Sequence, residues 1–257
     1  MKFYTSIQQY NNVILERYIE DGVHKQREVP YQPTLFVPTV KQSPYKTITG
    51  ERVEPRGFNS IKEARDFIQA RDKVSNDPVY GMQQFAYAYI QEQYPTREFD
   101  VNQLNILNFD IETRSDEGFP NIREADMEIL SIALRCNGQS YILGCGEYKT
   151  SGDDKYIKCV SEADLLHKFI DLWRELNPDI VTGWNVEMFD IPYTVNRIQR
   201  RLSTEAVNQL SPWGIVKDRL IPTAQTQAQG DNAEPNAKEI IGITAVSYTH
   251  LTLPTKA

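Results

Sequence analysis

Residues 108–113, with the sequence NFDIET, decide the fold of this chain of 257 residues. Apolar and polar residues alternate here, which predicts a strand, and side chains two residues apart on a strand point to the same side. Asp110 and Glu112 are therefore expected to converge on one spot. Paired carboxylates are typical ligands of Mg²⁺ or Mn²⁺, and two such ions promote in-line displacement at phosphorus. The alternative is the polar end of an ordinary strand, because short motifs occur by chance.

A second segment adds a third carboxylate. Residues 177–185 read NPDIVTGWN, and residues 189–193 read FDIPY. The apolar pair before Thr182 predicts a short buried strand, which Gly183 is expected to end. A proline favours the first turn of the next helix, so Asp190 is placed at a helix start. Helix capping is an alternative role for this aspartate, but it does not explain the Gly-Trp-Asn run just upstream.

The elements between these motifs predict a mixed sheet with a crossover helix. Strands are expected at residues 104–113, 128–136 and 140–143, with a turn at Asn137. Ser161 is expected to cap a helix that leads directly to the next strand. The apolar stripe of that helix, read as core, is Leu165, Leu166, Phe169, Ile170, Trp173 and Leu176. Residues 223–237, rich in Gln, Ala and Asn, predict a mobile loop.

The first hundred residues have a different pattern. Short strands are expected at residues 6–10, 13–19 and 25–29, joined by hairpin turns, followed by helices after Ser60 and over residues 82–94. This predicts an α+β domain with no chemistry of its own. Its aromatic residues are read as packing groups rather than as a base-stacking platform, and they include Phe85, Tyr87 and Tyr89.

Composition describes an ordinary globular protein, with 40% hydrophobic and 25% charged residues. Three cysteines without metal-type spacing indicate a reducing compartment. No signal region or membrane-spanning run is apparent, so neither export nor insertion is expected. The net charge of -7 affects solubility and non-specific binding, but it says little about the charge within any one binding cleft. The basic residues Arg197, Arg200, Arg201, Lys217 and Arg219 are read as the solvated side of a helix and its following loop.

The acidic motifs together resemble those of a known family. FDIET at residues 109–113, followed by GWN and FDIPY, is similar to the first and second exonuclease motifs of family B DNA polymerases, most closely those of T-even-like bacteriophages. The resemblance covers nearly the whole chain. It includes residues 1–4, 14–19, 27–36, 116–120, 201–203 and 238–243.

This resemblance implies an organisation and a function. Residues 1–103 would be the N-terminal polymerase domain, and residues 104–245 an incomplete 3′-to-5′ exonuclease domain with a ribonuclease H-like fold and a mixed sheet. The parent protein would be a replicative, proofreading DNA-directed DNA polymerase acting in the cytoplasm of a bacterial host cell. Its partners would be a single-stranded 3′ end of DNA, a primer-template and a sliding clamp, the last through residues not present here.

The resemblance also implies roles for individual residues. Asp110 would bridge two Mg²⁺ or Mn²⁺ ions, Glu112 would bind the ion that activates water, and Asp190 would hold the second ion, largely through water. Phe119 and Asn185 are similar to family residues that line the nucleotide at the DNA end. Simpler alternatives are packing for Phe119 and a local backbone hydrogen bond for Asn185.

Two departures from the family pattern matter. The third exonuclease motif, with its tyrosine and final metal-binding aspartate, is missing, and so are the palm motifs of polymerisation. Two alternatives therefore stay open: a nucleic-acid-binding module without catalysis, since N-terminal domains in this family can bind RNA or template, and a stand-alone RNA or DNA exonuclease. The first hundred residues disfavour the second alternative.

The final residues form a separate question. Residues 246–255, VSYTHLTLPT, do not continue the family pattern and resemble the translation of a sequencing adapter. We therefore expect the natural sequence to end near Ala245 and residues 246–257 to form a non-native, poorly packed tail. A divergent but natural C-terminus is the alternative.

Overall fold

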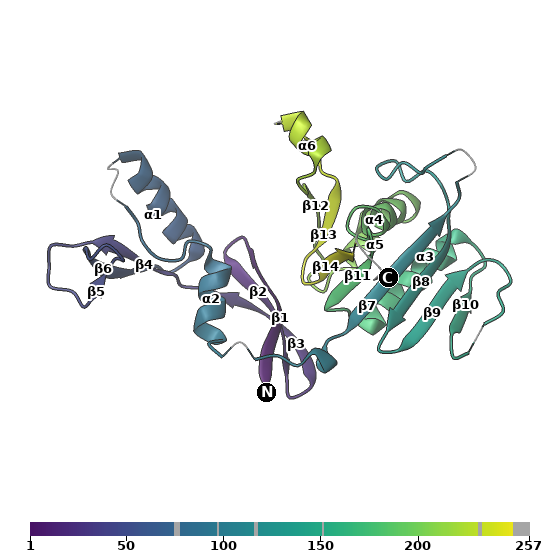
Figure 1. Cartoon of the computed structure of the whole chain (residues 1–257), viewed down its shortest axis with the longest axis horizontal. Helices are drawn as coiled ribbons and strands as arrows, with labels where there is room; N and C mark the ends of the chain where they lie inside the picture. The colour runs from purple at the N-terminus through teal and green to yellow at the C-terminus, as the bar shows by residue number, and fades with distance from the viewer. Residues whose placement is uncertain (75–77, 97, 116–117, 151, 231–232, 249–257) are drawn as a thin grey trace, which may run out of the picture. The chain divides into compact units, whose positions relative to one another are not determined.

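The computed structural model describes residues 1–74, 78–96, 98–115, 118–150, 152–230 and 233–248. The chain divides into two compact units, Met1–Gln103 and Leu104–Ala257 (Figure 1). Their boundary lies where the pattern of the sequence changes.

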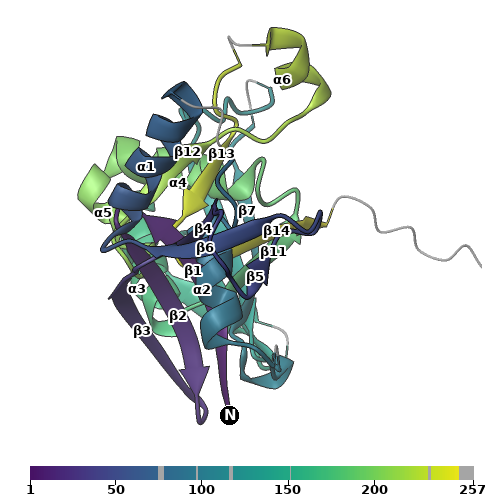
Figure 2. The same cartoon turned by 90° about the vertical axis from the view of Figure 1, so that its left-hand side faces the viewer.

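The N-terminal unit contains two small antiparallel sheets and two helices (Figure 2). The first sheet is a meander of β1 (Lys2–Tyr10), β2 (Val13–Glu20) and β3 (Val23–Pro30). The second has the order β4-β6-β5, with β4 at Thr34–Pro38, β5 at Tyr45–Lys46 and β6 at Arg52–Gly57. Helices α1 (Ile61–Val74) and α2 (Phe85–Gln93) follow, and a 3-10 turn at Val101–Gln103 ends the unit.

Local sequence signals explain most of this unit. Asn11 and Asp21 adopt positive φ angles of 52° at the two hairpin turns, a conformation that Asn and Asp tolerate better than most residues. The Ser60 hydroxyl accepts the Glu63 backbone N–H at 3.2 Å, which confirms the predicted cap. Helix α2 starts at Phe85, three residues later than predicted.

Glu16 on β2 is a fully buried carboxylate in the N-terminal unit. It accepts hydrogen bonds from the Arg27 guanidinium and from the hydroxyls of Tyr94 and Tyr89, the last at 3.0 Å. Burial disfavours its charge, but the three donors outweigh that penalty and hold the pKa of Glu16 below its ordinary 4.5. The ionised carboxylate therefore ties β2 to β3, α2 and the segment after α2.

Replacing Glu16 by Gln should lower the stability of the N-terminal unit by about 1–3 kcal/mol at neutral pH, because Arg27 and the hydroxyls of Tyr89 and Tyr94 lose a charged acceptor. A lowered pKa in the folded state contributes stability that is present above pH 4.5 and lost as the pH falls below it. The deficit should therefore shrink on acidification. Hydrogen exchange of the β2 amides across a urea series measures it, with the exposed Glu28→Gln as control. A deficit independent of pH would contradict the prediction.

The second unit contains a six-stranded mixed sheet with the order β10-β9-β8-β7-β11-β14. Its strands are β7 (Ile106–Thr113), β8 (Ile129–Cys136), β9 (Gln139–Gly144), β10 (Lys155–Lys158), β11 (Ile180–Trp184) and β14 (Thr244–Tyr248). Pairing is antiparallel for β7–β8 and β8–β9, and parallel for β9–β10, β7–β11 and β11–β14. The predicted mixed α/β class and mixed sheet are confirmed in this form.

Helix α3 (Glu162–Leu176) packs on β8 and β9, and α4 (Asp190–Arg201) contacts β7 and α5 (Thr204–Asn208). A hairpin of β12 (Val216–Arg219) and β13 (Ala237–Ile240) extends beyond the sheet and carries α6 (Ala224–Gln229). Five of the six predicted stripe residues of α3 are buried, and Leu176 packs partly buried against the same core. Figures 1 and 2 show the hairpin projecting from the unit with α6 at its far end. The predicted loop at residues 223–237 therefore contains a helix.

Residues 246–248 of the expected poorly packed tail belong to a strand, although none of them is buried and Val246 is 47% exposed. They complete β14, whose register with β11 runs from Ile180↔Thr244 to Trp184↔Tyr248. The Thr182 hydroxyl donates to the Val246 carbonyl at 2.9 Å. Edge pairing uses backbone groups, so it requires little of the sequence. Leu251 and Leu253 lie outside the described residues, and the origin of residues 246–257 stays a prediction.

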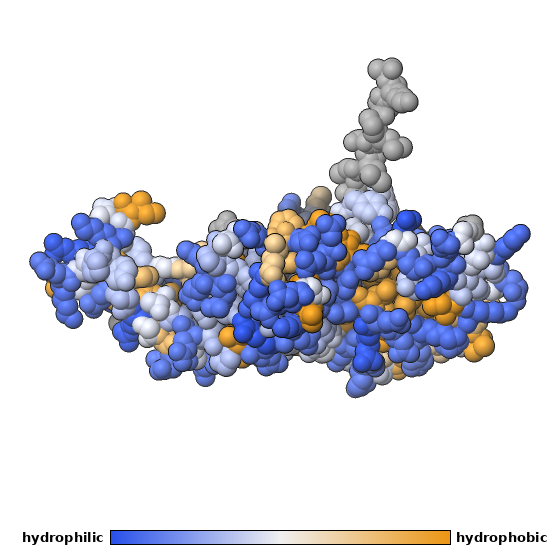
Figure 3. All heavy atoms as spheres, turned by 90° about the horizontal axis from the view of Figure 1, so that it is seen from below, coloured by the Kyte–Doolittle hydropathy of each residue, from blue (hydrophilic) through white to orange (hydrophobic). Residues whose placement is uncertain are grey.

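The surface of the described residues carries scattered apolar side chains, among them Val40, Ile48 and Val160. The face drawn in Figure 3 is mainly hydrophilic, with apolar surface in separate patches. Within the described part of the chain, no helix combines the length and apolar character needed to cross a membrane.

Candidate carboxylate site

Strand β7 divides its side chains between the core and the open face of the sheet. Leu107, Phe109 and Ile111 are buried, whereas Asp110 and Glu112, which alternate with them, are exposed. The Phe109 ring stacks on Phe169 of α3, with ring centroids 5.5 Å apart. This packing fixes the register of β7, because a slip of one residue would bury both carboxylates. The predicted shared face is confirmed, and the register of β7 with β8 shifts between Glu112 and Thr113.

The sheet opens just beside these carboxylates. Pairing of β7 with β11 ends at Thr182↔Asn108, although β11 continues through Gly183 to Trp184. The prediction that Gly183 ends the strand is wrong. Gly183 instead allows the backbone of β11 to approach that of β7 closely. A Cβ atom at this position would lie 2.4 Å from the Phe109 carbonyl oxygen. Only glycine lets β11 pass β7 so closely before the two strands separate.

Asp190 occupies the opening. Its Oδ1 accepts the Ile111 backbone N–H at 3.1 Å, so the carboxylate takes the place that a neighbouring strand would fill. Asp190 is the first residue of α4, as predicted, and no side-chain cap is present there. The capping alternative is therefore wrong. The aspartate side chain accepts its hydrogen bond from the β7 backbone at Ile111, the residue between Asp110 and Glu112.

The electrostatics of the site act on Asp190. It is only 3% exposed, and burial, together with the negative charges of Asp110 and Glu112, raises its pKa to about 6, against the hydrogen bond from Ile111. Three neighbouring carboxylates are suitable oxygen ligands for a hard divalent cation, which would offset the repulsion between their negative charges. Among the described residues, no group of three or more His, Cys, Asp or Glu side chains is already arranged to hold a metal ion.

The two predicted nucleotide-lining residues are on loops beside this site. Phe119 is 81% exposed, and its ring centroid lies 5.2 Å from that of Phe189, which stacks on Tyr193. Asn185 has a positive φ of 53°, and its carbonyl accepts the backbone N–H groups of Met188 and Phe189. Asn185 thus shapes the turn before Asp190. Asp116 and Glu117, part of the resemblance noted above, lie outside the described residues.

Helix α4 also holds the loop that follows β7. Four of its side chains donate hydrogen bonds of 2.7–2.9 Å to backbone carbonyls of residues 122–127. The donors are Tyr193, Asn196, Arg197 and Arg200. The reading of Arg197 as a solvated residue is wrong, since it is 6% exposed. Its place between Val195 and Ile198 was the available signal.

A buried ion pair joins α4 to α3. Arg197 donates from Nε and Nη2 to both carboxylate oxygens of Glu162, at 2.6 and 2.7 Å. Glu162 also accepts the Ile129 backbone N–H at 2.9 Å. Bidentate geometry satisfies the charged groups without solvent. The pair thereby connects α4, α3 and β8 behind the carboxylates.

The mixed sheet with carboxylates at its opening defines a candidate site for cation-dependent chemistry, and comparison with known proteins identifies the family. Residues 51–243 match the family model described as DNA polymerase family B, exonuclease domain. This chain belongs to that family.

Individual relatives agree with this assignment. The DNA-directed DNA polymerase of Enterobacteria phage T4 is 32% identical over 250 residues, which cover 86% of this chain and 28% of the relative. The DNA-directed DNA polymerase of Escherichia phage RB69 is 29% identical over 82% of this chain and 27% of the relative. The DNA polymerase delta catalytic subunit of Caenorhabditis elegans is 30% identical over 49% of this chain and 12% of the relative. The chain thus spans little more than a quarter of the phage relatives.

Proposed function

We propose that this chain forms the N-terminal and proofreading part of a replicative DNA-directed DNA polymerase, and that its second unit removes nucleotides from the 3′ end of DNA. The observation that carries the proposal is the hydrogen bond from Ile111 N–H to Asp190, which brings the two acidic motifs to one opening in the sheet. The strand order and the crossover helix α3 support a ribonuclease H-like fold.

Each residue has a distinct task in this proposal. Asp110 and Glu112 would hold two Mg²⁺ or Mn²⁺ ions from the open face of β7, and Asp190 would complete the site from α4. Ions bound there supply activation of water and offset charge on the leaving oxygen. The hydrogen bond from the Ile111 N–H holds Asp190 on the β7 backbone between the other two carboxylates, although the three are not already arranged around one ion.

The nucleotide at the strand end would contact the aromatic residues beside the carboxylates. Phe119 presents an exposed ring that Phe189 supports from behind, and aromatic faces stack on any base. Sequence-tolerant stacking suits an enzyme that removes whichever nucleotide is mispaired. Asn185 would keep the supporting turn in shape through its carbonyl.

The activity of the whole polymerase also belongs to the proposal. The phage relatives are DNA-directed DNA polymerases, which supports template-directed synthesis by the whole protein in a host cell. A primer-template substrate, a sliding clamp and RNA at the N-terminal unit rest only on the family resemblance of the sequence. A binding module without catalysis is the second candidate. It predicts strand binding with no role for Asp110 or Glu112.

Divalent cations should stabilise this chain without any substrate. Binding at about 100 times the dissociation constant adds about 2.7 kcal/mol to the folded state, so Mg²⁺ or Mn²⁺ should raise the melting temperature of the second unit. The rise should be lost in Asp110→Ala and Glu112→Ala. Differential scanning fluorimetry at constant ionic strength measures it.

The matched control is Asp171→Ala, which removes an exposed carboxylate from α3. It should keep the full cation response. An equal response in the wild type, Asp110→Ala and Asp171→Ala would mean that the cation binds elsewhere, and the exonuclease proposal would then lose its metal site.

A further inference from the structure

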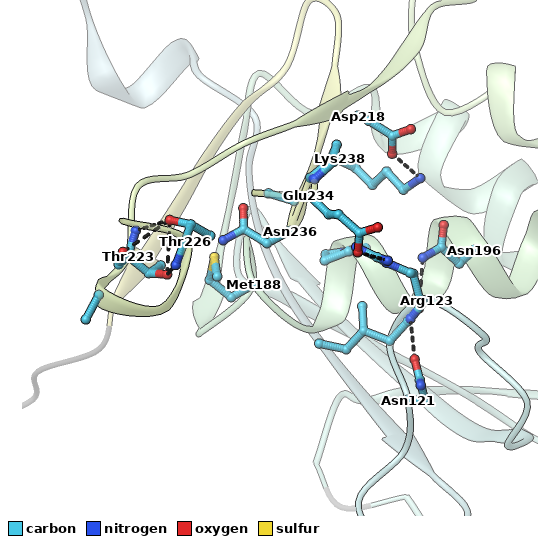
Figure 4. A pocket seen from close by; sticks show the side chains of 15 residues that line it. Asn121, Arg123, Met188, Asn196, Asp218, Thr223, Thr226, Glu234, Asn236 and Lys238 are labelled. Carbon is cyan, nitrogen blue, oxygen red and sulfur yellow. Dashed lines mark hydrogen bonds and ion pairs between the residues drawn. The ribbon is translucent and has the colours of Figure 1, made fainter. Parts of the chain in front are cut away.

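A cavity of about 1000 Å³ lies in the second unit beside the proposed site. Its walls come from α4, from the loop after β7 and from the β12–β13 hairpin with α6. Figure 4 shows Asn121, Arg123 and Asn196 on one side of the cavity, with Thr223 and Thr226 on the other. The volume is at the upper end of the usual range for ligand pockets.

The charged residues of this cavity neutralise one another. Arg123 forms an ion pair with Glu234, which joins the loop after β7 to the segment before β13. Lys238 Nζ lies 2.6 Å from Asp218 Oδ1 across the hairpin. Two cations and two anions therefore line the cavity in pairs. A phosphate group would have to break one of these pairs to gain a positive partner.

Two asparagines leave a donor and an acceptor available on one wall. Asn121 Oδ1 accepts the backbone N–H groups of Arg123 and Glu124 at 2.9 and 3.2 Å, and its amide NH₂ has no partner among the described residues. Asn196 Nδ2 donates to the Ile122 carbonyl at 2.8 Å, so its Oδ1 is held in a fixed orientation. Both asparagines line the cavity, and these hydrogen bonds hold each amide in one orientation.

Apolar side chains complete the cavity. Met188, Pro192 and Ile122 line it together with the asparagines. A methionine thioether makes favourable contacts with aromatic rings and adapts to their shape. Flat apolar contacts combined with an amide donor and acceptor are typical of sites that read an unpaired base along its edge.

We propose that this cavity binds an unpaired nucleobase of the DNA strand whose end lies at the carboxylates. The inference rests on the proposed function and extends it to a second, separate subsite. Continuity along the chain supports it, because Met188 and Pro192 flank Asp190 and Asn121 follows Phe119 by two residues. The subsite holds the base, not the phosphate, and therefore distinguishes a strand with a base at that position from one without.

The test uses single-stranded 12-nucleotide DNA in EDTA, where hydrolysis is suppressed. Each strand carries one abasic residue at a different position, and fluorescence anisotropy gives its dissociation constant for the 257-residue chain. We expect a position at which loss of the base weakens wild-type binding about tenfold, the effect of losing one stacked and hydrogen-bonded base.

Three variants assign that position to the cavity. Ala224→Trp places a large ring in the cavity from its exposed rim, and it should weaken binding of the intact strand about tenfold and abolish the sensitivity to that abasic position. Asn121→Asp keeps the acceptor for the loop N–H groups but removes the amide donor, and it should act in the same direction. The control, Gln227→Trp, adds the same ring to an exposed residue of α6 outside the cavity and should bind like the wild type.

The outcomes separate the two proposals. If the wild type binds the strand but every sensitive position persists in Ala224→Trp, the base subsite is overturned and strand binding stands. If no position is sensitive in the wild type, the subsite is also overturned. If the wild type binds no strand at all, both the subsite and the proposed function fail.

Discussion

Replacing Asp110 by Ala should reduce 3′-end digestion of single-stranded DNA by at least about 100-fold, in a chain that continues past residue 245 through a third carboxylate motif. Loss of residues that merely support a metal site already costs about 10- to 100-fold, and Asp110 is proposed to contact both ions. Release of mononucleotides from an end-labelled strand measures the rate. Asp110→Asn should fail as well, because the amide keeps the shape but loses the charge.

Two comparisons make this result specific. Asp171→Ala, with its exposed carboxylate on α3, should digest DNA at the wild-type rate. The 257-residue chain should digest DNA feebly or not at all, even in millimolar Mg²⁺ or Mn²⁺, because it lacks the last carboxylate of the family pattern. Vigorous digestion by this chain would show that other residues complete the site. Full activity in the longer Asp110→Ala chain would remove the mechanism.

The sequence predicted those parts of the site that depend on local pattern. The alternation in β7 placed Asp110 and Glu112 on one face, and that face is open because Phe109 and Ile111 fill the core. Proline and the acidic residue before it located the start of α4. These outcomes follow from strand and helix periodicity, which a single sequence expresses directly.

Long-range contacts were not predictable in the same way. Gly183 was read as a strand breaker, but its function depends on the Phe109 carbonyl 74 positions earlier in the chain. Nothing within β11 itself encodes that approach. The pairing of residues 246–248 was not predictable from their sequence either. They extend the sheet through backbone hydrogen bonds to β11, although their sequence does not continue the family pattern.

Arg197 is the clearest residue whose role required the fold. Charge on a helix usually indicates solvent, yet its guanidinium is enclosed by Glu162 and by the carbonyls of Ala125 and Asp126. Burial of a charge in this way depends on partners supplied from two separate segments, α3 and the loop after β7. A sequence pattern shows the arginine but not its partners.

Arg197→Ala should therefore lower the free energy of unfolding of the second unit by about 3 kcal/mol, because the buried Glu162 would lose its bidentate partner. It would keep only the longer ion pair with Arg201, at 3.3 Å, and the Ile129 N–H. The three tryptophans, Trp173, Trp184 and Trp213, all lie in this unit, so urea unfolding followed by tryptophan fluorescence reports its stability. Arg200→Ala on the same helix is the control. Arg200 is exposed and donates to a single carbonyl, and its loss should cost less than about 1 kcal/mol.

The double variant Glu162→Gln with Arg197→Met tests the cause of that loss. Gln keeps an acceptor for the Ile129 N–H, and Met fills much of the arginine volume without a charge. If the loss of the bidentate partner of Glu162 causes the destabilisation, the double variant should be more stable than Arg197→Ala, since the buried carboxylate is then absent. If both variants are equally destabilised, the loss lies in the hydrogen bonds from Arg197 to the loop after β7, and positioning of that loop, rather than charge pairing, is what the arginine contributes.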